Sequence, residues 1–368
     1  MPSSPHYTVT SSMKVMDVGQ GIVIFSLTGD ISAALEQELS GLLDQAGKGT
    51  NILDFQAATS LDNTALSMLV RLHNSTRHGG QRLFAAGLSG RMLDVFRLAR
   101  LDEGIPCYGD IATALRKAGY SGQPPQELLR KSPPVDNAAD SPWAEPVSRL
   151  SVKPMPGEAV NLNVGGRRVA GPMQGFGQLW QKTYRISLPG NISPEQAIST
   201  LKENFTKYQP PANRFFPPPE GISPGEVILI NADTPGGLVV TGVMVLYAGP
   251  ESFTFITPQG HPEAGWVTFS AFKDNGFTTV QIEGLARAGD PVYELAFRIA
   301  GSRLQQSIWM NVLQSMLKHL NVDGQVQVTP VRLDTRLQWN RLFNLFLNAQ
   351  ILTMLYTPAL IYRKLFNR

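Results

Sequence analysis

Apolar and polar positions in the first third of the chain alternate between strand-like runs and helix-like stripes. Apolar runs of strand length lie at residues 21–27, 52–55 and 82–88. A stripe at helical spacing follows each run, as Leu66, Leu69 and Val70 do after the second. Strands that alternate with helices of about 10–15 residues predict a sheet with helices packed on it. We therefore predict an α/β (α+β) domain at residues 12–119.

The second half of the chain has a different pattern. We predict a strand at residues 180–188, and Ser193 followed by Pro194 predicts a helix start. Further strands with turn residues between them are expected at 226–231, 238–247, 252–257, 266–272 and 277–286. A long apolar stripe predicts a closing helix at 291–320. An antiparallel meander followed by a long helix is typical of an α+β layer, so we place a second domain at 161–331.

The remaining segments lack this domain-like pattern. Residues 120–160 are rich in proline and poor in apolar periodicity, which predicts an extended tether. Residues 342–362, in the C-terminal segment 332–368, contain no charge, and basic residues flank them. Gln338, Arg341, Asn344 and Asn348 form a polar stripe opposite a broad apolar face. Such a helix would lie on or span an anionic membrane, or would pack on protein through that same apolar face.

Composition narrows the function classes. The 368 residues suffice for two cores, and a net charge of +3 without a dense basic run argues against nucleic-acid binding. The single Cys107 and five histidines without metal-site spacing give no support for a disulfide framework or a metal site. No cofactor motif is present. The polar start lacks a secretory pattern, so we expect a cytoplasmic protein, peripheral to the inner face of the membrane if the C-terminal helix binds there.

The polar turn at residues 59–66 carries the first candidate chemistry. Asp62 stands at the N-cap position of the following helix, and Thr64 lies in its first turn. A phosphoryl group on Thr64 would bring negative charge to the positive end of the helix dipole. Clusters of Ser, Thr, Asp and Asn also occur at helix starts for capping alone.

The first domain resembles STAS domains, the family of anti-sigma-factor antagonists and of sulfate-transporter tails. The matching segments are Leu27–Asp30, Leu53–Phe55, Ser60–Leu66 and Leu88–Leu101. The resemblance implies that Thr64 is the phosphoacceptor, and that Asp30, Asp62 and Asn63 share its face. Asn63 stands where the family has a first hydroxyl residue, and Ala65 where it has glycine. The resemblance also implies partner switching with an anti-sigma factor or switch kinase. The chain itself shows no kinase motif.

The second domain resembles the helix-grip fold of START-like and polyketide-cyclase-like proteins. Residues 260–265 (GHPEAG), 269–272, 285–291 and 302–305 carry the resemblance. It implies a curved sheet around a helix, with an apolar cavity between them. Candidate lining residues, which could equally form a solid core, are Phe253, Phe255, Trp266, Phe269, Val280 and Ile282. His261 and Glu263 are an acid/base pair to consider for catalysis, but we favour a β-turn at Pro262, because no third polar partner can be named.

Together these features predict a non-enzymatic regulatory adaptor. Its STAS module would switch partners through Thr64, and its second domain would bind an apolar ligand. The alternative is a carrier or sensor of a lipid or other apolar molecule, docked at a membrane through the STAS module and the C-terminal helix.

Overall fold

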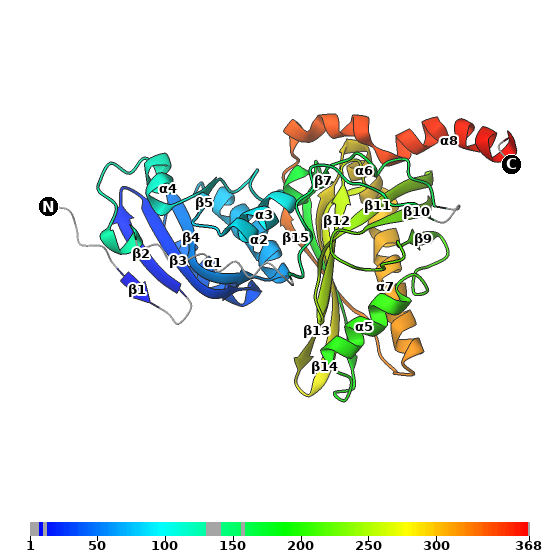
Figure 1. Cartoon of the computed structure of the whole chain (residues 1–368), viewed down its shortest axis with the longest axis horizontal. Helices are drawn as coiled ribbons and strands as arrows, with labels where there is room; N and C mark the ends of the chain where they lie inside the picture. The colour runs from blue at the N-terminus through cyan, green and yellow to red at the C-terminus, as the bar shows by residue number, and fades with distance from the viewer. Residues whose placement is uncertain (1–6, 10–12, 130–140, 156–158, 367–368) are drawn as a thin grey trace. The chain divides into compact units, whose positions relative to one another are not determined.

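The structure is a computed structural model that describes residues 7–9, 13–129, 141–155 and 159–366. The chain divides into two compact units, Met1–Ser141 and Pro142–Arg368, each of which is coloured by sequence in Figure 1. The middle of the predicted tether, including Pro133 and Pro134, lies outside the described residues. So do the side chains of residues 359–368, which include the basic residues predicted to follow the apolar tail.

The first unit contains a six-stranded sheet in the order β1-β2-β3-β4-β5-β6. The strands are β1 (Tyr7–Val9), β2 (Met13–Gly19), β3 (Ile22–Ile31), β4 (Thr50–Leu61), β5 (Arg82–Ala86) and β6 (Cys107–Tyr108). The first two pairings are antiparallel, and β3 to β6 run parallel. The connecting helices are α1 (Glu36–Gln45), α2 (Asn63–His78), α3 (Gly90–Leu98) and α4 (Ile111–Ala118). The predicted alternation of strands and helices is confirmed.

The central strands of this unit are apolar because helices cover the sheet. Ile24 on β3 and Ile52 on β4 are fully buried, and Phe84 on β5 is nearly so. Together with residues of α4 they form one core cluster. This core holds the carboxyl ends of the parallel strands β3 and β4 at one edge of the sheet, where α2 begins.

The second unit contains a nine-stranded antiparallel sheet in the order β15-β8-β14-β13-β12-β11-β10-β9, with β7 paired to β12. Its strands are β7 (Val169–Ala170), β8 (Leu179–Leu188), β9 (Asn213–Phe216), β10 (Val227–Thr234), β11 (Gly237–Ala248), β12 (Ser252–Pro258), β13 (Glu263–Asp274), β14 (Phe277–Ala288) and β15 (Gln327–Asp334). α5 (Pro194–Asn204) and α7 (Ser302–His319) contribute to one core with these strands (Figure 1). The predicted large antiparallel sheet is thus confirmed.

The closing helix predicted at 291–320 is interrupted. It consists of α6 (Pro291–Ala296), a π turn at Phe297–Gly301 and α7. A π turn widens the helix locally and shifts the side chains that follow it. Phe297, the first residue of the turn, lines two neighbouring cavities that are described below.

The predicted tether at 120–160 is folded at both ends. The turn η2 (Gln126–Leu129) inserts Leu128 into the core of the first unit. In the second unit Trp143 packs edge-on against Tyr247, with ring centroids 4.9 Å apart, and Leu150 is buried. Burial of these isolated apolar side chains fixes segments that proline content alone predicts to be extended.

The C-terminal segment packs on the second unit through its polar stripe. It consists of the 3-10 helix η5 (Trp339–Leu347) and α8 (Ala349–Phe366). The amide of Asn344 donates to the carbonyls of Gln174 and Gly289, and that of Asn348 donates to Asp290, each at 2.8 Å. We predicted that packing on protein would use the apolar face. Instead that face is exposed, because its polar counterpart satisfies buried carbonyls and a buried carboxyl group.

The exposed apolar side chains of this segment are large. Trp339, Phe343, Phe346 and Leu355 are each about 67–74% exposed. No helix in the described part of the chain reaches the length and apolarity that crossing a bilayer requires.

Candidate functional site

Thr64 lies at the edge of the first sheet where β4 gives way to α2. Asp62 caps that helix, and its Oδ1 accepts hydrogen bonds from the backbone N–H groups of Thr64 and Ala65, both at 2.9 Å. The Thr64 hydroxyl donates to the same Asp62 oxygen at 2.6 Å and accepts from the backbone N–H of Ala33 at 2.9 Å. Thr64 therefore ties η1 (Ala33–Leu35) to the start of α2.

Asp30 brings a second carboxylate to this edge. Its Oδ1 accepts hydrogen bonds from the hydroxyls of Ser60 and Thr59, each at 2.7 Å. These bonds lower the pKa of Asp30 below its ordinary value, and the bond from Ser60 contributes most. Because β3 and β4 are parallel and Asp30 is in register with Ser60, the predicted face is assembled by the strand ends. It presents two carboxylates and three hydroxyls.

Asn63 does not belong to that exposed face, which corrects our prediction. Its side chain is 3% exposed. Ser67 and Val70, which follow at helical spacing, are also buried, so Asn63 begins an inward-facing stripe of α2. Capping by Asp62 fixes the rotation of the helix and turns Asn63 towards the interior.

A cavity of about 300 Å³ opens inside the second unit. Of the six predicted lining residues, Phe255 and Trp266 line it. The other four, Phe253, Phe269, Val280 and Ile282, lie in packed core instead. Phe205, at the end of α5, fills that space: its ring centroid lies 5.3 Å from that of Phe269 and 6.0 Å from that of Phe253. The cavity is therefore confined to the other end of the sheet.

His261 and Glu263 both line this cavity. His261 Nδ1 lies 3.0 Å from the backbone nitrogen and 2.9 Å from the carbonyl oxygen of Glu263, so it hydrogen-bonds to the backbone of that residue. Burial lowers the pKa of His261 to about 4. The turn spans Pro258–His261, closed by a 3.2 Å hydrogen bond, and not the predicted Pro262 corner. His261 is therefore neutral, and its Nδ1 hydrogen-bonds to backbone beside the turn, which is a structural role.

The carboxyl group of Glu263 faces a small polar network. Gln305 on α7 donates to Glu263 Oε1 at 2.6 Å, and Lys182 on β8 donates to the Gln305 carbonyl oxygen at 2.5 Å. Burial raises the pKa of Glu263, and the nearby Lys182 charge opposes that rise. Burial lowers the pKa of Lys182. A second cavity of about 110 Å³ lies beside the first and shares Glu263 and Gln305 with it.

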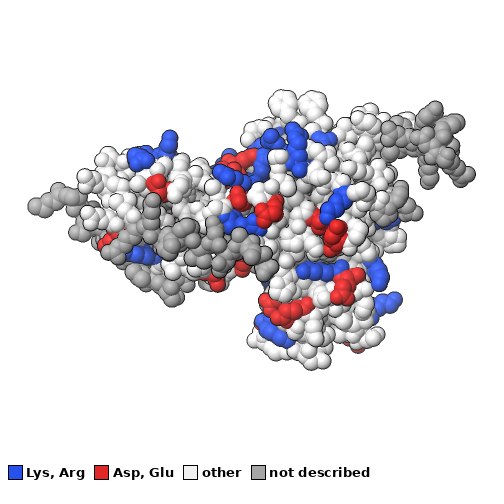
Figure 2. Space-filling view, viewed as in Figure 1, with Lys and Arg blue, Asp and Glu red and all other residues white. Residues whose placement is uncertain are grey.

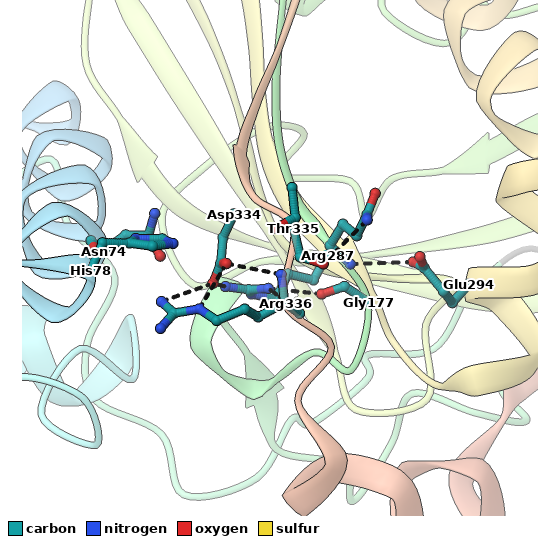
Figure 3. A network of polar contacts seen from close by, with 9 residues as sticks. Asn74, His78, Gly177, Arg287, Glu294, Asp334, Thr335 and Arg336 are labelled. Atoms are coloured by element: carbon teal, nitrogen blue, oxygen red, sulfur yellow. Dashed lines mark hydrogen bonds and ion pairs between the residues drawn. The ribbon is translucent and has the colours of Figure 1, made fainter.

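A buried ion pair supports the wall of the smaller cavity (Figure 3). Arg287 on β14 donates to Asp334 Oδ2 at 2.7 Å and to the carbonyl of Gly177 at 2.8 Å. Arg336 donates to the other carboxylate oxygen of Asp334 at 3.0 Å. The side chains of Arg287 and Asp334 are only 4% and 2% exposed, respectively. This network anchors β15 to β14 across β8.

Sequence reasoning missed Lys182, Asp334 and the polar role of Gln305. A signal existed for Lys182: Tyr184, Ile186 and Leu188 face the core at alternate positions of β8, and Lys182 continues that series. A lysine on the inward series of a strand indicates a polar site within the core. For Asp334 no such pattern exists, because its buried partner Arg287 is 47 residues away.

Comparison with known proteins assigns a family to part of the first unit. The family model of the STAS domain matches residues 13–114. Similar solved structures include an anti-sigma factor antagonist from Mycobacterium paratuberculosis, which is 22% identical, covers 32% of this chain and 97% of that chain, and has a TM-score of 0.25. The Bacillus cell fate determinant SpoIIAA in its phosphorylated form is 15% identical, with 29% of this chain and 98% of that chain covered and a TM-score of 0.25.

Another similar solved structure is that of the di-domain ARO/CYC StfQ from the steffimycin biosynthetic pathway. It is 10% identical, covers 39% of this chain and 53% of that chain, and has a TM-score of 0.31. No curated protein matches the chain. The strand and helix order of the first unit agrees with the family match. Residues 13–114 of this chain form a STAS domain.

Proposed function

We propose that this protein is a non-enzymatic, cytoplasmic regulatory adaptor whose STAS domain switches a protein partner through Thr64. The main support for this proposal is the pair of hydrogen bonds that the Thr64 hydroxyl makes with Asp62 and Ala33. The Thr64 hydroxyl donates to Asp62 Oδ1 over 2.6 Å, so Asp62 is placed to take the proton when Oγ1 attacks the γ-phosphoryl group of a nucleoside triphosphate and the nucleoside diphosphate leaves. The partner would be an anti-sigma factor or a kinase of the switch type, which supplies the nucleotide.

Phosphorylation of Thr64 would change both the charge and the geometry of this edge of the first sheet. The new group would bring about −1.5 to −2 charge beside Asp62 and Asp30. It would also remove the hydrogen bond that Thr64 donates to Asp62, and would crowd the bond from Ala33 N–H to Thr64 Oγ1, which ties η1 to α2. A partner that binds the unmodified face would then meet repulsion and an altered loop.

We expect Thr64→Glu to weaken binding of the partner by about tenfold or more, because it adds a charge at the centre of the face. The measurement is titration of the full-length protein against the switch-kinase and anti-sigma proteins of its own host. Ser75→Glu is the matched control: Ser75 is exposed near the other end of α2, so it receives the same charge away from this face and should bind like wild type. Equal affinity of wild type and Thr64→Glu for every such protein would exclude switching at Thr64.

A second candidate function is that of a carrier or sensor of an apolar molecule, docked at an anionic membrane by the C-terminal segment and the STAS domain. Two observations favour it: the cavity of about 300 Å³ and the outward apolar face of η5 and α8. Residues 342–358 carry no charge. Figure 2 shows Lys and Arg side chains beside η5 and uncharged side chains along its outer edge. Aromatic side chains with nearby cations suit the headgroup region of an anionic bilayer.

We expect Phe343→Ser/Phe346→Ser to reduce binding to phosphatidylglycerol vesicles by at least about tenfold, because each ring contributes apolar burial. Co-sedimentation with the vesicles measures this. Phe277→Ser, at an exposed hairpin end, is the control and should bind like wild type. If the double variant changes the oligomeric state and leaves vesicle binding unaltered, the face packs on a second copy instead.

A further inference from the structure

The larger cavity of the second unit is apolar along most of its wall, with polar groups at a few positions. Its apolar residues include Phe255, Val243 and Trp309. Two polar side chains on this wall stand out by their hydrogen bonding: Glu263 on β13 and Thr241 on β11. They come from different strands, so the sheet itself builds this polar part of the wall.

Thr241 is buried, at 2% exposed, and within the described part of the chain its hydroxyl has no hydrogen-bond partner. Leaving a hydroxyl unsatisfied in an apolar interior costs about 1–3 kcal/mol. The lining therefore holds a group whose hydrogen-bonding capacity is not used by the protein. A bound molecule with a polar atom at this point would use it.

Glu263 likewise has room for a second partner. Among the described side chains, Gln305 alone hydrogen-bonds its carboxyl group, at Oε1. A carboxylate has about four acceptor positions, so a hydrogen-bond donor that enters the cavity can be accepted there. Lys182 lies behind Gln305 and contributes a positive charge to the same network.

The charges restrict the ligand. An acid would place a second carboxylate beside Glu263, which like-charge repulsion opposes. An amine would be attracted by Glu263, but Lys182 already offsets that charge, and the ammonium group would lose its hydration on entry. A hydroxyl group can donate to Glu263 or bond to Thr241, at no cost in buried charge.

We propose that this cavity binds an uncharged apolar molecule that carries a hydroxyl group, with Glu263 and Thr241 as its hydrogen-bonding residues. The inference rests on the proposed binding of an apolar molecule in the second unit, and it adds the chemical class of that molecule. Both residues act only by binding the molecule, and no chemical reaction is involved.

The test compares three probes of equal chain length, 1-decanol, decanoate and decylamine, on the full-length protein. Tryptophan fluorescence reports binding, because Trp266 and Trp309 line the cavity. We expect 1-decanol to bind about tenfold more tightly than either charged probe. Thr241→Val, which keeps the shape of the side chain and removes its hydroxyl, should weaken the binding of 1-decanol by about threefold to tenfold. Its unfolding midpoint should not fall.

Glu263→Gln removes the negative charge of the side chain but keeps its shape. The affinity of this variant for 1-decanol should lie within about threefold of the wild-type value. Its affinity for decanoate should be about tenfold higher than that of wild type, because the repelling carboxylate is gone. Glu251→Gln, in an exposed turn away from both cavities, should leave all affinities unchanged. Tightest binding of decanoate by wild type, or unchanged affinities in both cavity variants, would overturn the inference. Equal binding of all probes would leave an apolar ligand site without the hydroxyl preference, whereas no binding at all would remove the ligand site too.

Discussion

Replacing Arg287 with methionine is expected to lower the free energy of unfolding of the second unit by about 3–5 kcal/mol. The guanidinium donates to Asp334 and to the carbonyls of Gly177 and Arg336. Burial alone would raise the pKa of Asp334, but hydrogen bonds from Arg287 and Arg336 outweigh it and hold that pKa at about 2. Asp334 therefore stays ionised at neutral pH. Without Arg287 a buried carboxylate would lose its main partner, and two buried carbonyls would lose a donor.

Urea denaturation followed by tryptophan fluorescence measures this effect, since all five tryptophans lie in the second unit. Arg185→Met is the control: Arg185 is exposed on β8, so its loss should cost less than about 1 kcal/mol. Arg287→Met/Asp334→Leu should recover part of the lost stability, because it removes the unpaired charge as well. A cost for Arg287→Met no larger than that for Arg185→Met would mean that the ion pair does not hold β15 in place.

Local patterns were enough to predict the order of the central strands and helices in both units. The stripe of Leu66, Leu69 and Val70 and the cap at Asp62 place α2 within a residue of its observed start. The turn at Asn275 and Gly276 joins β13 to β14 as expected. These features depend on residues that are neighbours in sequence, so a single sequence contains them.

Two strands, β2 and β15, were not predictable in this way. β2 carries Lys14 and Asp17 among its apolar residues and has no clear alternation. β15 is mostly exposed, and it is fixed by β8 and by the ion pair of Asp334. β15 depends on pairing with a strand that lies 100 residues or more away in the sequence, which composition and spacing do not encode.

The candidate sites show the same division. The contacts of Thr64 with Asp62 lie within one helix start, and the sequence indicated them. The hydrogen bond from Ala33 to Thr64 requires the parallel pairing of β3 with β4. In the second unit, whether a buried phenylalanine lines a cavity or fills the core depends on where Phe205 of α5 packs. Phe269 is the clearest case of that ambiguity.

Phe269→Ala is expected to lower the free energy of unfolding of the second unit by about 3–5 kcal/mol. The ring is fully buried and lies 4.5 Å from Phe253, in a stacked arrangement. It also contacts the rings of Phe205 and Trp309 edge-on, at 5.3 and 5.5 Å. Removing it would leave an empty volume that these rings cannot fill without moving, so both apolar burial and packing would be lost.

Phe272→Ala provides the matched comparison, because Phe272 lies on the same strand but is 38% exposed. The identical chemical change there should cost about 1 kcal/mol or less, since the side chain is already partly in water. Urea denaturation with tryptophan fluorescence measures both variants. If the two costs were equal, Phe269 would not be part of a close-packed core, and the space around Phe205 would have to be treated as an extension of the ligand cavity. A large difference would confine apolar ligands to the end of the sheet where Phe255, Trp266 and Glu263 lie.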